Sequence, residues 1–238
     1  MFKNQKRPDR GRTPKGQATR ERALRAALGL FRRKGFDKTT MRDIAEAAGL
    51  SLGAAYHYFP SKVALVMAYY EWIQSEHERR AREQTPEGAG TATRLAVLLR
   101  TKLDLLARDR KVLAALFKNL GDPAHPLSLF GRPTAAIRRR SIAQFEEAFA
   151  GAAIPAGLRR LAGLGAWLAH LALFLFFLHD RSRGQARTRR LGEEIAAMSA
   201  GAPLLLSLPF AAPYVARLHE LACELGFAGR GEGGGGVK

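Results

Sequence analysis

The sequence of 238 residues is poor in cysteine and in acidic side chains. Its one cysteine, Cys223, excludes an intramolecular disulfide and a cysteine-rich zinc site, and is typical of a protein kept in a reducing compartment. No run of alternating Val, Ile or Thr predicts a β-strand. No glycine loop lies where it could hold a phosphate between a strand and a helix. The basic N-terminus lacks a following apolar segment, so we expect no secretory signal.

The deficit of acidic residues leaves a strongly basic chain. It has 39 Lys and Arg against 21 Asp and Glu, and a formal net charge of +18. Such a charge attracts polyanions, so nucleic acid and anionic membrane are the two partners to consider. The histidines are scattered without paired metal-ligand spacing, and no catalytic constellation is recognisable. We therefore expect no enzyme, no cofactor and no metal site, and a cytoplasmic location.

Apolar residues recur with the helical period along the whole chain, which predicts an all-α fold. A first helix carries Ala23, Ala27 and Phe31 on one face and ends at Gly35. The expected later helices span 40–48, 51–59, 61–82, 91–108, 110–120, 133–150, 155–180, 187–200 and 203–226.

The second and third expected helices are short and joined by a tight turn, AAGLS. Thr40 is the predicted N-cap of the second helix, with Asp43 three residues later, and Ser51 is the predicted N-cap of the third. Pro60 requires the third helix to end before it. This pattern is typical of a helix-turn-helix, whose second helix enters the major groove of DNA.

The stretch SLGAAYHYFPSK contains the third helix and four consecutive rings. The small residues at 53–55 allow a close approach to DNA, and the polar rings at 56–58 lie within reach of phosphates. Tyr56 also fits a buried position with a satisfied hydroxyl, whereas Phe59 is expected in the core. Lys62 opposes the helix dipole in the first turn of the fourth helix, which a bound phosphate would explain.

The segment TRERALRAALGLFRRKGFDKTTMRDIAEAAGLSLGAAYHYFPSKVAL resembles the DNA-binding domain of the TetR family of transcriptional regulators. The similar motifs are AxxLFxxxGF, TTxxxIAxxAG and SxGxxYxYFxSK, in that order. The resemblance implies that Lys62 holds a phosphate, and it assigns direct base readout chiefly to Arg42 and His57, because Leu52 and Ala54 offer only apolar contact. The DNA-binding residues that it implies are Thr40, Arg42, Ser51, Leu52, Gly53, Ala54, Tyr56, His57, Tyr58 and Lys62.

The resemblance also implies the organisation of the chain. We expect a basic arm at 1–18, the helix-turn-helix domain at 19–65, a helical regulatory and dimerisation domain at 66–228, and a flexible tail at 229–238. Two apolar helices near 155–180 and 203–226 are expected to form a homodimer, which would bind a palindromic DNA operator. Such a protein is a repressor that a small effector releases from DNA.

An effector pocket is implied between the helices of the regulatory domain. The candidate lining residues are aromatic or imidazole side chains, and they favour a largely apolar effector. Aromatic residues at helical spacing are also typical of an ordinary protein core. The candidates are Phe117, Phe130, Trp167, His170 and Phe174.

The apolar segment 161–178 supports an alternative, a basic membrane-associated protein anchored through this helix. It contains no formal charge and is near the lower length limit for a transmembrane helix. His170 in its middle and the charges that flank it favour a buried helix of a dimer, so we expect no membrane contact.

Overall fold

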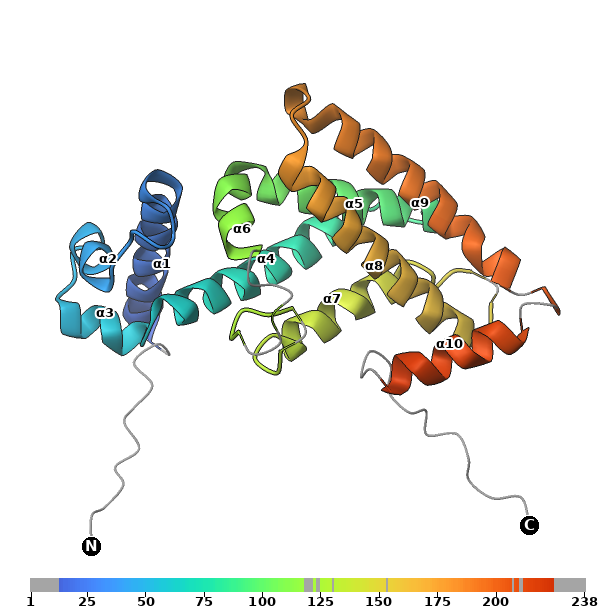
Figure 1. Cartoon of the computed structure of the whole chain (residues 1–238), viewed down its shortest axis with the longest axis horizontal. Coiled ribbons are helices and arrows are strands. Elements are labelled where there is room, and N and C mark those ends of the chain that lie inside the picture. The colour runs from blue at the N-terminus through green and yellow to red at the C-terminus, as the bar shows by residue number, and fades with distance from the viewer. Residues whose placement is uncertain are drawn as a thin grey trace, which may run out of the picture. The chain divides into compact units, whose positions relative to one another are not determined.

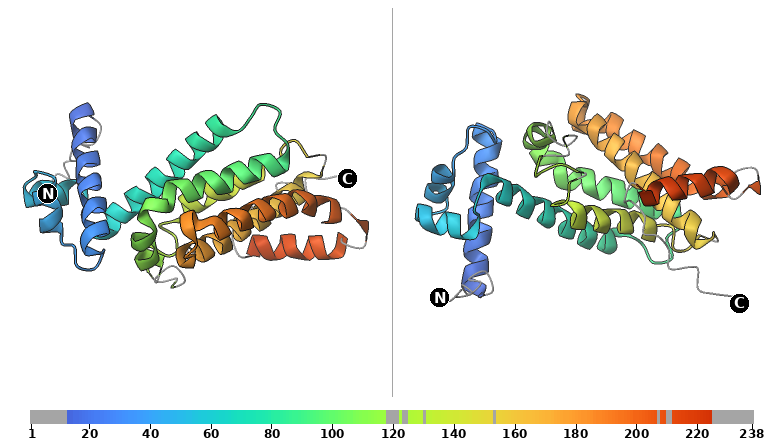
Figure 2. Two further views of the ribbon diagram at one scale, coloured as in Figure 1. Left: turned by 90° about the horizontal axis from the view of Figure 1, so that it is seen from above. Right: turned by 60° about the horizontal axis from the view of Figure 1, so that its bottom comes forward.

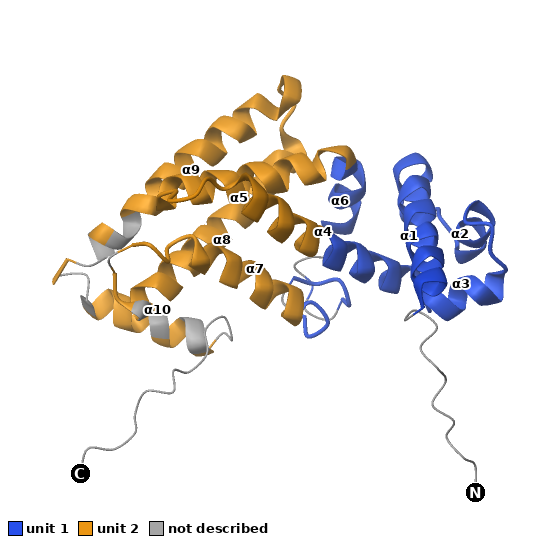
Figure 3. Cartoon of the chain, turned by 180° about the vertical axis from the view of Figure 1, so that it is seen from behind, with its two compact units in different colours: residues 1–72, 109–134 blue, residues 73–108, 135–238 orange. Residues whose placement is uncertain are grey.

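The computed structural model describes residues 13–117, 122, 125–129, 131–152, 154–206, 208–209 and 212–224. Every regular element in this part of the chain is a helix, as predicted (Figure 1). The chain divides into two compact units, Met1–Trp72 with Asp109–Thr134 and Ile73–Arg108 with Ala135–Lys238 (Figure 3). The long helix α4, Lys62–Gln84, contributes to both units.

The first unit begins with a three-helix group. It consists of α1 (Pro14–Lys34), α2 (Met41–Ala47) and α3 (Leu52–Tyr58), in which α1 packs on α2 and α2 packs on α3. The start of α4 and helix α6 (Arg110–Phe117) complete the unit. The predicted core face of α1 is confirmed, because Ala23, Ala27 and Phe31 are all buried.

Local signals in the sequence determine where these helices begin and end. Thr13 caps α1, its hydroxyl accepting the Gly16 N–H at 3.1 Å, and Gly35 ends that helix with a φ of +85°. The turn between α2 and α3 requires a glycine, because Gly49 has a φ of +61°. Residues 14–18, which the sequence analysis places in the basic arm, form the first turn of α1 because Thr13 and Pro14 start the helix there. The rest of the expected arm, 1–12, lies outside the described residues.

The second unit is a helical bundle. Helix α8 packs between α7 and α9, and α5 packs against α9 (Figure 2). Asp180 fixes the connection from α8 to α9: its carboxylate accepts the N–H groups of Ser182 at 2.8 Å and Thr188 at 2.9 Å. The helices that complete this unit after α4 are α5 (Thr91–Leu106), α7 (Ala135–Glu147), α8 (Ala156–His179), α9 (Ala186–Leu206) and α10 (Ala212–Glu224).

The last part of the bundle differs from the expected helices at 187–200 and 203–226. Helix α9 continues through Gly201 and Pro203 to Leu206, and α10 begins only at Ala212. Proline removes one backbone donor, and in α9 this loss does not end the helix. The expected tail, 229–238, lies outside the described residues.

Candidate nucleic-acid interface and effector site

The third helix presents one exposed face. Leu52, Gly53, Tyr56 and His57 are exposed, and Tyr56 has 48 % of its surface accessible. This exposure contradicts the alternative of a buried tyrosine at this position. Phe59 is 2 % exposed, so its predicted place in the core is confirmed. The helix therefore packs through its small and apolar side and leaves its polar rings free to meet a partner.

The first turn of this helix has the predicted cap. The Ser51 hydroxyl accepts the Ala54 N–H at 3.1 Å. The His57 and Tyr58 rings contact each other edge to face with centroids 5.4 Å apart, and Tyr58 is half-buried. Of the predicted contacts on α3, Ala54 is also half-buried, whereas Ser51 is exposed.

Helix α2 begins with a complete capping box. The Thr40 hydroxyl accepts the Asp43 N–H at 3.1 Å, and the Asp43 carboxylate accepts the Thr40 N–H at 2.8 Å. The Thr40 N–H and the Lys34 ammonium, at 2.9 Å, lower the pKa of Asp43 to about 2. Arg42 projects from the same turn and is exposed. Asp43 is thus neutralised inside the unit, and Arg42 is left as the available cation of this turn.

Lys62 has partners that the sequence analysis does not predict. Its Nζ donates to the backbone carbonyl oxygens of Phe36 at 2.8 Å and Asp37 at 3.3 Å, and lies 4.5 Å from the centre of the Phe36 ring. In this structure the ammonium therefore holds the loop after α1. The position of a cation in the first turn of α4 is explained by these contacts without a phosphate.

The residues predicted to line an effector pocket are not all brought together. Trp167, His170 and Phe174 are buried on α8 in the second unit, and the Trp167 Nε1 donates to the Ser141 hydroxyl at 3.1 Å. Phe117 is half-buried and belongs to the first unit. Phe130 lies outside the described residues.

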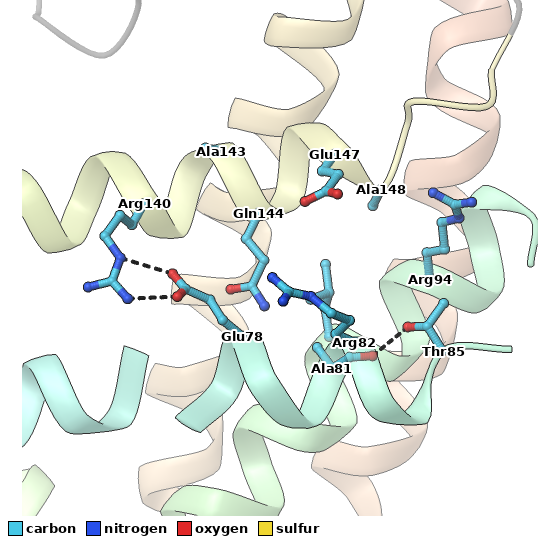
Figure 4. A pocket seen from close by; sticks show the side chains of 11 residues that line it. Glu78, Ala81, Arg82, Thr85, Arg94, Arg140, Ala143, Gln144, Glu147 and Ala148 are labelled. Atoms are coloured by element: carbon cyan, nitrogen blue, oxygen red, sulfur yellow. Dashed lines mark hydrogen bonds and ion pairs between the residues drawn. The ribbon is translucent and has the colours of Figure 1, made fainter. Parts of the chain in front are cut away.

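A cavity of about 430 Å³ lies elsewhere in the second unit, between α4, α5 and α7 (Figure 4). None of the five predicted residues lines it, and seven of its eleven lining residues have polar or charged side chains. Arg140 binds Glu78 through two nitrogens at 3.1 and 2.6 Å, whereas Figure 4 shows no hydrogen bond or ion pair from Arg82 or Glu147 to the other lining residues. The lining residues are Glu78, Ala81, Arg82, Thr85, Arg94, Leu98, Arg140, Ala143, Gln144, Glu147 and Ala148.

The sequence contains a periodic signal for this cavity. Polar side chains recur three and four residues apart on α4 and again on α7, which places each set on one helix face. The α4 set is Glu78, Arg82 and Thr85, and the α7 set is Arg140, Gln144 and Glu147. The periodicity cannot show that the two faces meet, because that depends on how α7 packs in the bundle.

Helix α8 is long and apolar enough to cross a membrane by length and composition, and 44 % of its most apolar window is buried within the chain. Its exposed side includes Leu168, Leu175 and Phe176. These positions share one helix face and form an apolar stripe. Helix α10 has a similar exposed stripe at Tyr214, Leu218 and Leu221.

Comparison with known proteins agrees with the geometry of the first unit. A model of the bacterial regulatory proteins of the TetR family matches residues 23–69. The regulator CymR of Pseudomonas putida is 38 % identical over 77 residues, 29 % of this chain and 38 % of its own length. The regulator TtgR of Pseudomonas putida is 34 % identical over 100 residues, 40 % of this chain and 48 % of its own length. The repressor KstR of Rhodococcus jostii is 34 % identical over 91 residues, 38 % of this chain and 42 % of its own length.

The chain thus spans less than half the length of these curated relatives. Solved structures match more of it. A TetR regulator from Nitrosomonas europaea has a TM-score of 0.62 at 21 % identity, covering 76 % of this chain and 97 % of its own. The SmeT–triclosan complex has a TM-score of 0.58 at 20 % identity, covering 78 % of this chain and 91 % of its own. The sequence similarity to the TetR family of bacterial regulatory proteins thus lies in residues 23–69, and the chain has the fold of the solved TetR regulator from Nitrosomonas europaea.

Proposed function

We propose that this protein is a sequence-specific DNA-binding transcriptional regulator, acting as a repressor, and not an enzyme. The observation that carries the proposal is the capped helix α3, which follows a tight turn and exposes Gly53, Tyr56 and His57. A helix presented in this way fits the major groove. The family match over residues 23–69 supports the same assignment.

Within this surface, the residues have different proposed roles. Arg42 and His57 are both exposed and reach base edges, where a guanidinium or an imidazole can discriminate between bases. Thr40, Ser51 and the α3 rings at Tyr56 and Tyr58 contact the phosphate backbone. Leu52, Gly53 and Ala54 allow a close approach and contact thymine methyl groups.

We propose that the protein binds a palindromic operator as a homodimer. One helix-turn-helix makes few contacts, and a dimer places two of them about one turn of DNA apart. The exposed stripes of α8 and α10 supply an apolar surface for a second copy. Covering α8 in this way accounts for its composition in a soluble, cytoplasmic protein.

A small, largely apolar effector is proposed to bind in the second unit and release the protein from DNA. Helix α4 belongs to both units, so a ligand that contacts its second half is connected to the DNA-binding unit by one continuous helix. Release requires that the effector bind the DNA-free geometry more tightly. A coupling free energy of about 1–3 kcal/mol is sufficient.

Selection of bound DNA from a random pool by the purified full chain, at fixed salt, tests the proposal. A palindrome with half-sites about one helical turn apart is the expected result. Binding without enrichment of any sequence, lost steeply as salt rises, would instead leave a general polyanion-binding protein. If the expressed protein could be recovered only with detergent, the alternative of a membrane-associated protein would be supported, with α8 inserted into lipid.

A further inference from the structure

The core of the second unit contains a lysine and two histidines. Lys102 on α5 is 7 % exposed, His77 on α4 is 0 % exposed and His170 on α8 is 7 % exposed. Lysine is seldom buried unless it is paired with an opposite charge. Burial, and next the positive charge of Lys102, lower the pKa of both histidines, so the three side chains lie within electrostatic range of one another.

Lys102 forms no ion pair with any of the described residues. Its Nζ donates only to the Gln74 Oε1, at a long 3.5 Å. Glu78 is the carboxylate whose charge reaches Lys102, and it is already bound to Arg140 at 3.1 and 2.6 Å. Lys102 is therefore a buried cation without an ion-pair partner of its own among the described residues. An unpaired buried charge is unfavourable in a protein interior.

The two histidines do not compensate this charge. Burial, and next the positive charge of Lys102, lower the pKa of His170 to about 3, and both also lower the pKa of His77, so both rings are neutral near pH 7. The His77 Nε2–H donates to the Leu98 carbonyl at 2.9 Å. The His170 Nδ1 is buried and has no hydrogen-bond partner in the described part of the chain. It is therefore a free donor or acceptor in the protein core.

The cavity of Figure 4 reaches this cluster through one side chain. Gln74 donates to the Gln144 Oε1 at 3.1 Å and to the Glu78 Oε1 at 3.0 Å, and both of these residues line the cavity. The other end of the same amide, the Gln74 Oε1, is the acceptor for Lys102. Rotation of Gln74 would thus open a path from the cavity to the lysine.

We propose that Lys102 and His170 bind the anionic head group of an effector that carries a carboxylate. The head group replaces Gln74 on the Lys102 ammonium and accepts the His170 Nδ1–H, and the apolar part of the molecule packs against the surrounding core. A carboxylate fits better than a phosphate because Lys102 carries one positive charge and the two histidines are neutral near pH 7. Charge-assisted hydrogen bonds of this kind are stronger than those between neutral groups. This inference rests on the proposed function, because it names the chemical class of the effector.

The test compares two carboxylic acids with their amides, which have the same shape but no charge. Benzoate, hexanoate, benzamide and hexanamide are titrated into the full chain at constant ionic strength, and thermal unfolding and calorimetric binding are measured. We expect a saturable rise in the unfolding temperature with at least one acid and none with its amide. If neither acid stabilises the protein more than its amide does, the inference is overturned.

Variants of Lys102 and His170 test whether the carboxylic acid binds at these two side chains. In Lys102→Met we expect at least tenfold weaker acid binding and an unfolding temperature without ligand at or above that of the wild type. Lys111→Met is the matched control: it removes the same charge from an exposed position on α6 and should bind the acid as the wild type does. His170→Phe keeps a ring but removes the nitrogen, and should weaken acid binding while leaving the fold intact.

Two results for these variants would contradict the inference. Acid binding by Lys102→Met at wild-type affinity places the carboxylate elsewhere. Failure of both Lys102→Met and Lys102→Gln to fold makes Lys102 a structural partner within the core. Operator binding is measured on the same samples by fluorescence anisotropy. If the protein binds a specific DNA sequence but no carboxylic acid, only this inference is wrong. If it binds no specific DNA sequence, the proposed function is wrong.

Discussion

Asp109 joins three segments of the first unit through its two carboxylate oxygens. Its Oδ1 accepts the Arg32 Nε–H at 2.5 Å, and its Oδ2 accepts from the Arg32 Nη2 at 3.1 Å and the Tyr69 hydroxyl at 2.5 Å. Asp109 is 3 % exposed, so these donors replace the water that its charge would otherwise need. The end of α1, the first half of α4 and the residue immediately before α6 are thus joined by one buried carboxylate.

Replacement of Asp109 by Asn should destabilise the protein by about 3 kcal/mol, because it leaves the Arg32 charge without its counter-ion. The free energy of unfolding from urea titration measures this loss. Asp104→Asn is the control, because Asp104 pairs with Arg189 at 2.7 Å at an exposed position and should lose less than about 1 kcal/mol. If both variants lost the same free energy of unfolding, the buried ion pair of Asp109 would contribute no more to stability than the exposed pair of Asp104.

Lys62→Met should lower stability by roughly 1 kcal/mol, because the carbonyl oxygens of Phe36 and Asp37 lose their donor. The salt dependence of DNA binding should stay the same if the ammonium acts within the unit. Urea unfolding and binding at several salt concentrations measure the two effects. If Lys62→Met reduced the salt dependence of the DNA-binding constant by about one ion, Lys62 would be a phosphate contact, as the sequence predicts.

The pKa of Lys102 makes stability depend on pH. Burial lowers this pKa from 10.5 to about 8, so the unfolded chain binds more protons between these two values. The free energy of unfolding should therefore rise with pH through this window, by on the order of 3 kcal/mol. Lys102→Met should remove the rise, and chemical unfolding from pH 7.5 to 10.5 measures it. A rise of equal size in Lys102→Met would assign the effect to another group.

At the scale of the elements, one glycine determines how closely α7 and α8 pack. A Cβ added at Gly163 on α8 would lie 2.6 Å from the Glu146 Cα and 2.8 Å from the Glu146 N on α7. Both are backbone atoms, which cannot move aside as the end of a side chain can. Gly165, on the same helix, has no atom within 4 Å of its added Cβ.

Gly163→Ala should therefore destabilise the second unit by about 2 kcal/mol, because the two backbones must separate. Gly165→Ala should be neutral or stabilising by up to about 1 kcal/mol, since alanine favours the helix. Thermal unfolding of both variants and the wild type provides the comparison. If Gly163→Ala were as stable as Gly165→Ala, the contact between α7 and α8 would not be close.

At the scale of the whole molecule, we expect a second copy of the chain to pack against the exposed apolar stripe of α8. Leu175 is 50 % exposed and Phe176 is 43 % exposed, on a helix whose other side forms the core. We expect Leu175→Glu to convert the proposed dimer to a monomer, because a charge is buried unpaired at the interface. Size-exclusion chromatography with light scattering measures the mass, and operator affinity should fall with it.

Trp72→Glu is the control for this experiment. Trp72 is 46 % exposed in the first unit, so its change introduces the same charge at a similarly exposed apolar side chain. Its mass should match that of the wild type. Dimers in both variants would exclude α8 from the interface, and monomers in both would indicate a general loss of assembly.

Features that depend on neighbours a few residues away could be predicted from the sequence. The caps at Thr40 and Ser51, the turn at Gly49 and the core position of Phe59 follow from hydrogen bonds and periodicity within single helices. The three-helix group and its exposed recognition face could therefore be predicted. Local signals were less informative near the C-terminus, where α9 continues through a proline that was expected to separate two helices.

The contacts between side chains that are distant in the sequence became visible only in the folded chain. Asp109 lies 77 residues from Arg32, Lys102 lies 28 residues from Gln74, and the Phe36 carbonyl that holds Lys62 is 26 residues away. No periodicity within one helix encodes these pairs, because they depend on how separate helices pack. The polar cavity and the buried lysine were missed for that reason. Burial also sets the proposed chemistry of Lys102, because a desolvated ammonium without an ion pair favours an anion more strongly than an exposed one does.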